Sequence, residues 1–184
     1  MNKTFRPLLR GSLLNKYSIL WDNNYYISFG DWLAEPRYSA NYEAEIKIVI
    51  RQTGSSLIAT IDDRQFIVRD NLYTIISNDT RYSEFVLLSL INSKFLNWYY
   101  QNIINNEVGE ALAQVKRGHI QILPLPEFSQ PSFNSIENLV KELLKIKRDD
   151  PNRITESFEK KIDYLVYKLY DLSEEEVIGI EELL

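Results

Sequence analysis

The sequence predicts an α+β protein: a β-rich part with one long amphipathic helix, followed by a C-terminal helical hairpin or spacer. Three observations lead to this prediction. Apolar residues alternate with other residues up to Arg51, which is the two-residue period of a strand. From Ser83 the apolar spacing changes to three and four residues, which is the period of a helix, and helical spacing returns beyond Pro131. We therefore expect a recognition domain at 1–126 and a helical segment at 127–184.

The clearest strand signal is KIVIRQTGSSLIATID, residues 47–62. A strand ends at Arg51, and a return strand is expected at Leu57–Ile61. The residues between them suit a turn, because Gly54 can adopt positive φ and its neighbours are small and polar. Arginine, glutamine, threonine and serine side chains on this turn can contact base edges or phosphates. A polar turn with an incidental arginine is the simpler alternative.

The other elements follow from the same periodicities. Residues 1–45 are expected to be irregular apart from one strand. That strand is Tyr25–Phe29. Two short strands are expected next, at Gln65–Val68 and Leu72–Ile76, and then a long helix at Glu84–Ile103 that Ser83 caps.

The second half begins with a polar, basic segment, Gln114–Arg117. The apolar run Ile120–Leu123 precedes a proline, which favours an extended conformation. Three helices are then expected: one that starts at an Asn134/Glu137 capping box, one with an apolar stripe from Phe158 to Leu169, and one that Ser173 and Glu176 cap.

The composition is that of a water-soluble globular protein, with 45% hydrophobic and 26% charged residues in 184. There are no cysteines, so disulfides and thiolate metal sites are impossible, and His119 is the single histidine. No apolar run reaches the length of about 20 residues that spans a bilayer, and the N-terminus is too polar for a signal peptide. We expect a cytoplasmic protein without a membrane partner.

The net charge of −5 argues at first against a nucleic-acid partner, because proteins that bind phosphates usually carry a basic excess. The acidity is not evenly distributed. Residues 1–125 contain 13 Lys and Arg against 12 Asp and Glu, and the remaining residues contain 8 against 14. The front part can therefore present a local basic face.

Catalytic motifs are scarce. The sequence has no glycine-rich phosphate loop and no Asn-Pro-Pro-Tyr run, so we expect no nucleotide or S-adenosylmethionine site in this chain. One alternative remains. Asp31 followed by Glu45 and Lys47 resembles the pattern of a Mg²⁺-dependent nuclease, in which carboxylates hold the metal and the lysine steadies the attacking water.

Several separated segments resemble one family in the same order: RPLLRG, EPR, KIVIRQTG with LIATID, NLYTI, LLSLINSKFLNWYY, QVKRGHIQILPLP and IDYLVYKLYDLSEEEV. Together they resemble the C-terminal target-recognition domain of Taq-type adenine-specific DNA methyltransferases and of bacterial type IIG restriction-modification enzymes. That domain is similar in role to the recognition domains of type I specificity subunits. The resemblance extends from Arg6 to Val177.

The resemblance implies a non-catalytic domain that recognises double-stranded DNA and clamps it against a methyltransferase or nuclease domain of the same or a partner chain. S-adenosylmethionine and Mg²⁺ would be bound by that catalytic domain, with no cofactor or metal in this chain, which resembles an excised or split-off module. In such a domain the segments 47–56 and 114–119 would lie on or near the DNA, and LINSKF would support them.

Arg51 and Gln52 are the preferred base readers, because arginine can donate two hydrogen bonds to guanine and glutamine can pair with adenine. Seven further residues complete the predicted DNA contacts, mostly to phosphates: Lys47, Thr53, Ser55, Arg64, Lys94, Lys116 and Arg117. A third hypothesis is a protein-interaction module, in which the acidic C-terminal helices dock a partner subunit.

Overall fold

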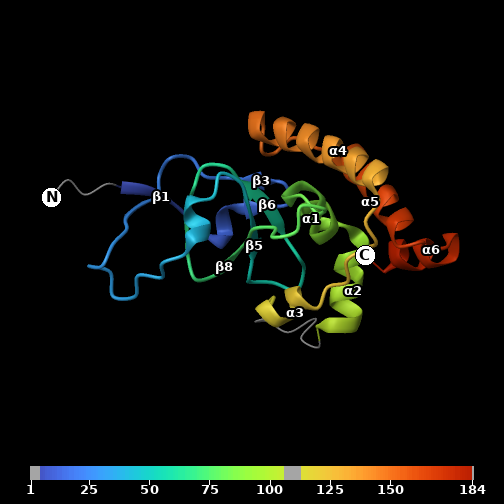
Figure 1. The fold of residues 1–184 in the computed structure, drawn as a ribbon, viewed down its shortest axis with the longest axis horizontal. Helices are drawn as coiled ribbons and strands as arrows, with labels where there is room; N and C mark the ends of the chain where they lie inside the picture. Colours follow the sequence, from blue (N-terminus) through green and yellow to red (C-terminus); the bar gives the residue numbers. More distant parts are fainter. Residues whose placement is uncertain (1–4, 106–112, 184) are drawn as a thin grey trace.

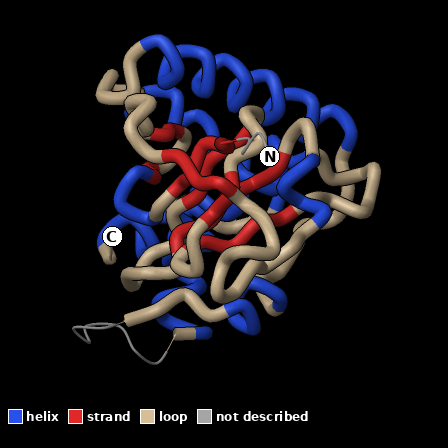
Figure 2. Tube along the Cα trace, turned by 90° about the vertical axis from the view of Figure 1, so that its left-hand side faces the viewer, coloured by secondary structure: helices blue, strands red, loops and turns tan. Residues whose placement is uncertain are grey.

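A computed structural model describes residues 5–105 and 113–183. Its fold is α+β, as predicted: small sheets and short helices make up the N-terminal part, and three further helices follow at the C-terminal side (Figure 1). In the perpendicular view the strands lie in the middle of the molecule, with helices around them (Figure 2). None of the helices described is long and apolar enough to cross a lipid bilayer.

The central sheet contains the predicted hairpin. Its antiparallel strands lie in the order β6-β5-β8, with bounds β5 Lys47–Arg51, β6 Ala59–Asp62 and β8 Leu72–Ile75. Gly54 has a φ of 111°, so the prediction of positive φ in the turn is confirmed. Both faces of β5 are covered. Ile48 and Ile50 belong to the main core, while Val49 packs in a second cluster with Leu9, Leu14, Phe66 and Leu72.

A second sheet has the order β4-β1-β7, with bounds β1 Phe5–Leu9, β4 Tyr26–Ser28 and β7 Ile67–Val68. The expectation that the first 45 residues contain one strand is wrong. β1 was missed because its proline, Pro7, cannot donate to a ladder. Pro7 pairs only with β4, and β7 joins β1 in parallel farther along, at Leu8 and Leu9. The predicted strand at 65–68 therefore belongs to this second sheet and not to the central one.

Shorter elements connect these sheets. A two-stranded hairpin and two 3-10 turns precede β5; their bounds are β2 Leu14–Asn15, β3 Ser18–Ile19, η1 Gly11–Leu13 and η2 Ala40–Glu43.

The predicted long helix is divided at Ser93. α1 (Glu84–Asn92) begins at Ser83, whose hydroxyl accepts the backbone N–H of Val86, as predicted. α2 (Lys94–Tyr99) begins directly after Ser93, whose hydroxyl accepts the N–H of Leu96. A π-helical turn, η3 (Tyr100–Ile104), follows.

Two details of the second half differ from expectation. The apolar run after Arg117 was expected to be extended, but residues Arg117–Gln121 form a short helix, α3. The capping box at Asn134 is wrong as well, because the N-cap of α4 (Gln130–Asp149) is Ser129, five residues earlier, and Pro131 lies in the first turn. Glu137 instead binds the hydroxyl of Ser83 on α1 at 2.7 Å.

The last two helices agree with prediction. α5 is Glu156–Leu169 and α6 is Glu174–Glu182, and α6 has the predicted capping box between Ser173 and Glu176. The C-terminal helices pack on α1 and α2, and one hydrophobic cluster contains residues from both parts of the chain, including Ile48, Leu88, Ile136, Val140, Val166 and Ile180. The boundary at residue 126 stays a prediction.

Candidate nucleic-acid interface

The turn between β5 and β6 pairs with a segment more than 50 residues later in the chain. Thr53 forms an antiparallel bridge with Gln114. The N–H of Gly54 donates to the carbonyl of Ala113 at 3.0 Å, and the N–H of Val115 donates to the carbonyl of Gln52 at 2.7 Å. We call residues 51–56 and 113–117 the paired-loop surface. The structure thus places side by side the two segments that the resemblance assigned to the DNA face.

Two asparagines of the helical segment below fix the position of this turn. Asn92 accepts the N–H of Ala59 and donates to its carbonyl, at 2.9 Å in each case. Asn97 accepts the N–H of Leu57 at 2.9 Å. Both asparagines are buried, and their side chains satisfy the backbone groups of Leu57 and Ala59 that face the helices. Gln101 adds a bond to the Ser56 hydroxyl at 2.9 Å.

The predicted contact residues of the turn differ in accessibility. Thr53 is exposed, whereas Arg51, Gln52 and Ser55 are half-buried. The guanidinium of Arg51 folds over its own turn, with Nε donating to the carbonyl of Thr53 at 3.1 Å. Gln52 uses both backbone groups internally, since its N–H donates to the carbonyl of Asn71 at 3.0 Å. This turn is therefore held rigidly before any ligand binds.

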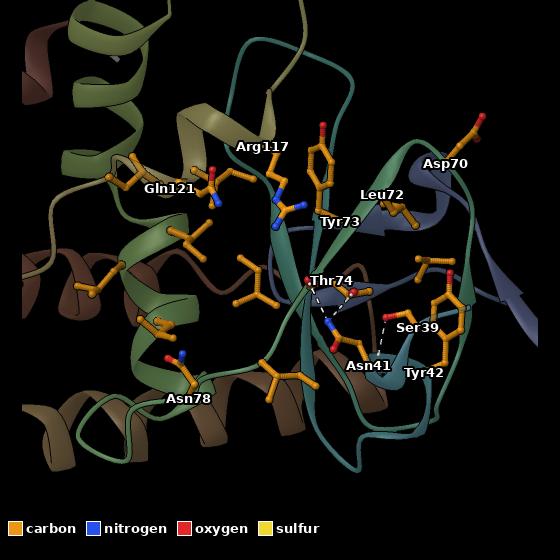
Figure 3. Close-up of a pocket in the computed structure, with 18 of the residues that line it drawn as sticks. Ser39, Asn41, Tyr42, Asp70, Leu72, Tyr73, Thr74, Asn78, Arg117 and Gln121 are labelled. Carbon is orange, nitrogen blue, oxygen red and sulfur yellow. Dashed lines mark hydrogen bonds between the residues drawn. The ribbon is translucent and has the colours of Figure 1, made fainter. Parts of the chain in front are cut away.

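An open groove of about 970 Å³ lies next to the paired-loop surface, between β8 on one side and α1 and α3 on the other. Its floor is apolar, with Leu87, Leu90 and Ile91 from α1. Asn41 closes part of the β8 edge by donating to the Thr74 carbonyl at 3.3 Å and hydroxyl at 3.0 Å (Figure 3).

Three arginines line this groove: Arg37, Arg69 and Arg117. Arg117 was among the predicted contacts; it extends from α3 toward β8 and lies beside Tyr73 (Figure 3). Arg37 and Arg69 were not among them. Arg69 lies in the turn before β8, and the polar residues between two apolar runs are a local signal for such a turn. Arg37 comes from a loop whose position nothing in its local sequence predicts.

The assignment of Lys47 to phosphate contact is wrong. Its side chain is fully buried, and its Nζ lies 2.7 Å from Oδ2 of Asp62, which is equally buried. Asp62 also accepts the backbone N–H groups of Arg64 at 2.8 Å and Phe66 at 3.0 Å. The pair therefore holds the β6–β7 connection inside the protein, where DNA has no access.

The burial of Lys47 also contradicts the Mg²⁺ nuclease alternative, which requires this lysine beside the attacking water. A lysine that is buried beside Asp62 has no access to a catalytic water. Asp31 accepts a hydrogen bond from the hydroxyl of Tyr38 at 2.5 Å, in the loop before η2. Across residues 5–105 and 113–183, no group of three His, Cys, Asp or Glu side chains is placed to hold a metal ion.

Two further predicted contacts lie elsewhere. Arg64 lines a second groove of about 480 Å³, between β6 and α4, at the sheet edge opposite β8. Lys94 forms an ion pair with Glu181 of α6. Lys116 and Arg117 are exposed at the start of α3, directly after the paired segment. The structure thus gathers Arg51, Gln52, Thr53, Ser55, Lys116 and Arg117, and separates Arg64 and Lys94 from them.

Charged residues fasten the C-terminal helices to the β-rich part. Asp163 of α5 accepts the backbone N–H of Lys94 at 2.9 Å. Lys16, beside Asp163, donates to the Asn92 carbonyl at 2.8 Å and so joins the β2–β3 turn to α1. Burial raises the pKa of Asp163 and lowers the pKa of Lys16. Glu181 also binds the Tyr167 hydroxyl. Some of the C-terminal acids therefore have internal partners, and docking of a partner subunit by the remaining ones stays a prediction.

Comparison with known proteins adds one match. The family model of the TaqI-like C-terminal specificity domain matches residues 6–125, which include β1 through α3 and hence the whole paired-loop surface and the groove beside it. No curated protein matches the chain.

Proposed function

Because this chain belongs to the TaqI-like C-terminal specificity domain family, whose role is target recognition in restriction-modification enzymes, we propose that it binds duplex DNA sequence-specifically through the paired-loop surface. The observation that carries the proposal is the hydrogen-bonded pairing of residues 51–56 with 113–117. This pairing joins Arg51 and Thr53 to Lys116 and Arg117 in one surface, although the two segments are distant in sequence.

The chemistry of this surface suits a nucleic acid. Arginine, lysine and threonine are the side chains that most often contact phosphates, and rigid elements position such contacts more precisely than mobile loops. The net negative charge of the chain belongs to residues 126–184, whose helices α4, α5 and α6 lie along the top and right of Figure 1, whereas α3 lies at the bottom. A local basic surface can therefore form on a protein that is acidic overall.

The catalytic steps would belong to another domain or chain. In this proposal an adenine methyltransferase domain supplies the S-adenosylmethionine site, and a nuclease domain, if the parent enzyme is of type IIG, supplies Mg²⁺. The present chain holds the target duplex in register against that domain, in the bacterial cytoplasm. Its contribution to catalysis is the choice of DNA sequence.

Fluorescence anisotropy tests the proposal directly. The full chain should bind a pool of random-sequence duplexes at low salt, alone or with its methyltransferase partner, and affinity should fall steeply as salt rises because phosphate contacts release counterions. Selection from that pool should enrich one sequence. Absence of binding under both conditions would contradict the proposal.

The variant Arg51→Ala tests whether the paired-loop surface contacts DNA. If Arg51 reads a base, this variant should lose discrimination between the enriched and scrambled duplexes; if it contacts phosphate, it should bind both more weakly. Arg153→Ala is the matched control, because Arg153 is an exposed arginine between α4 and α5, outside the paired-loop surface. Equal affinities of wild type and Arg51→Ala for both duplexes would exclude this surface.

A further inference from the structure

The short helix α3 presents one exposed face that carries two of the side chains best suited to base recognition. Arg117 and Gln121 are four residues apart, so they lie on the same side of the helix, and both line the groove beside β8. Both side chains are exposed. In Figure 3 they extend from α3 into the groove, Arg117 toward Tyr73.

The opposite face of α3 anchors the helix to the protein. The His119 ring, on this opposite face, lies 5.8 Å from the ring of buried Tyr100, and Ile120, which also lines the groove, packs against the main core. The helix begins two residues after Val115, whose N–H is bonded to Gln52 at the end of β5. α3 is therefore fixed at both its inner face and its start, so its exposed face is held in one orientation.

Gly118 completes the exposed face. It is exposed, and a Cβ atom built at this position would meet no protein atom within 4 Å. A glycine inside a helix costs about 0.5–1 kcal/mol relative to alanine. Among the residues that the structure describes, no atom from outside α3 fills the space beside Gly118, so another molecule can approach the helix backbone closely at this point.

We propose that α3 is a base-reading element, with Arg117 donating to a guanine and Gln121 pairing with an adenine of the target site. Arginine and glutamine make the bidentate contacts that distinguish these bases in the major groove. Four helical residues advance about 6 Å, which corresponds to about two base-pair steps of about 3.4 Å. The two bases should therefore lie within about two base pairs of each other.

The inference rests on the proposed function and goes beyond it. The hairpin turn was expected to read the bases; here Arg51 and its neighbours hold the phosphates, and sequence choice depends on α3. The difference is measurable, because loss of a phosphate contact weakens binding to all sequences about equally, whereas loss of a base contact relaxes specificity at one position.

Selection from random duplexes by the full chain, followed by sequencing, tests the inference. Wild type should enrich one motif. Arg117→Ala should lose its preference for guanine at one position by roughly 5- to 150-fold, and Gln121→Ala should lose its preference for adenine within about two base pairs of it. Arg153→Ala and Gln130→Ala are matched controls on exposed residues outside this region, and both should retain the full motif.

Each other result has a defined meaning. If Arg117→Ala and Gln121→Ala enrich the wild-type motif, or weaken binding to all sequences equally, α3 does not read bases, and the proposed function stands without it. If wild type enriches no motif, the proposed function itself fails.

Gly118→Ala supplies an independent readout. This variant should raise the thermal midpoint of the free chain, because alanine favours the helix, and should lower affinity for the enriched duplex at least several-fold. If Gly118→Ala kept the wild-type affinity for the enriched duplex, the proposal that DNA approaches α3 closely at this residue would be wrong.

Discussion

Lys47 and Asp62 form a buried ion pair at the centre of the β-rich part, with Nζ and Oδ2 2.7 Å apart. The sequence pattern placed Lys47 on a solvent face, because residues 47, 49 and 51 alternate with isoleucines. That inference fails since a second hydrophobic cluster, built from β1, the β2 region and Phe66, covers the outer face of β5. A strand whose faces are both buried is recognisable only when the distant segments that cover it are known.

Removal of one partner of this pair should destabilise the fold. Lys47→Ala leaves the Asp62 carboxylate buried without its cation, so the free energy of unfolding should fall by about 3–5 kcal/mol. Urea denaturation measures this change. Lys160→Ala, which removes an exposed lysine paired with Glu156, should shift the midpoint little. If Lys47→Ala lost DNA affinity without losing stability, the earlier prediction that Lys47 contacts phosphate would be supported instead.

At the scale of elements, periodicity predicted the long features well. The β5–β6 hairpin, the Ser83 cap and the α6 capping box are all as expected, because each depends on contacts within a few residues. α3 was missed because it is short and precedes prolines. The resemblance implied only that the segments 47–56 and 114–119 both lie near DNA. The pairing of residues 51–56 with 113–117 was not predicted, since backbone bridges between distant segments leave no local periodicity.

Asn92 links two of these elements, and its removal should loosen the turn that α1 supports. Asn92→Ala leaves the buried N–H of Ala59 without an acceptor, which should cost about 1–3 kcal/mol of unfolding free energy. Hydrogen exchange at the Ala59 amide should accelerate as well. Asn102→Ala, at an exposed asparagine bonded to the Trp98 carbonyl, is the control and should leave both quantities nearly unchanged. Unaltered exchange at Ala59 would show that Asn92 does not hold the strand.

The contact of α6 with α2 should depend on pH through Glu181. Burial alone would raise the pKa of Glu181, but hydrogen bonds from Lys94 and Tyr167 outweigh burial and lower it below its ordinary 4.5. An acid with a lowered pKa stabilises the fold above its unfolded pKa, and this contribution disappears as pH falls through the folded pKa. Glu181→Gln should therefore lower the thermal midpoint at pH 6, but not at a pH far below 4.5, where the carboxyl is protonated in both the folded and the unfolded state. A difference that persists unchanged at low pH would contradict this assignment.

At the scale of the whole molecule, the C-terminal helices contribute to the same hydrophobic cluster as the sheet. Phe133, Ile136, Val140, Ile162 and Val166 are all buried in it. A chain that ends at residue 126 would expose the faces of α1 and α2 that these side chains cover, so it should lack a cooperative urea transition. A sharp transition, with near-ultraviolet circular dichroism like that of the full chain, would show that the β-rich part folds alone.

The central claim is that the paired-loop surface contacts DNA phosphates, and the salt dependence of binding tests it most directly. The slope of log affinity against log salt should become shallower by about 2 in the double variant Arg51→Ala/Lys116→Ala, because each lost phosphate contact removes about 0.9. The double variant Arg153→Ala/Lys161→Ala removes the same charge outside this surface and should keep the wild-type slope. Equal slopes for wild type and the surface variant would contradict the account.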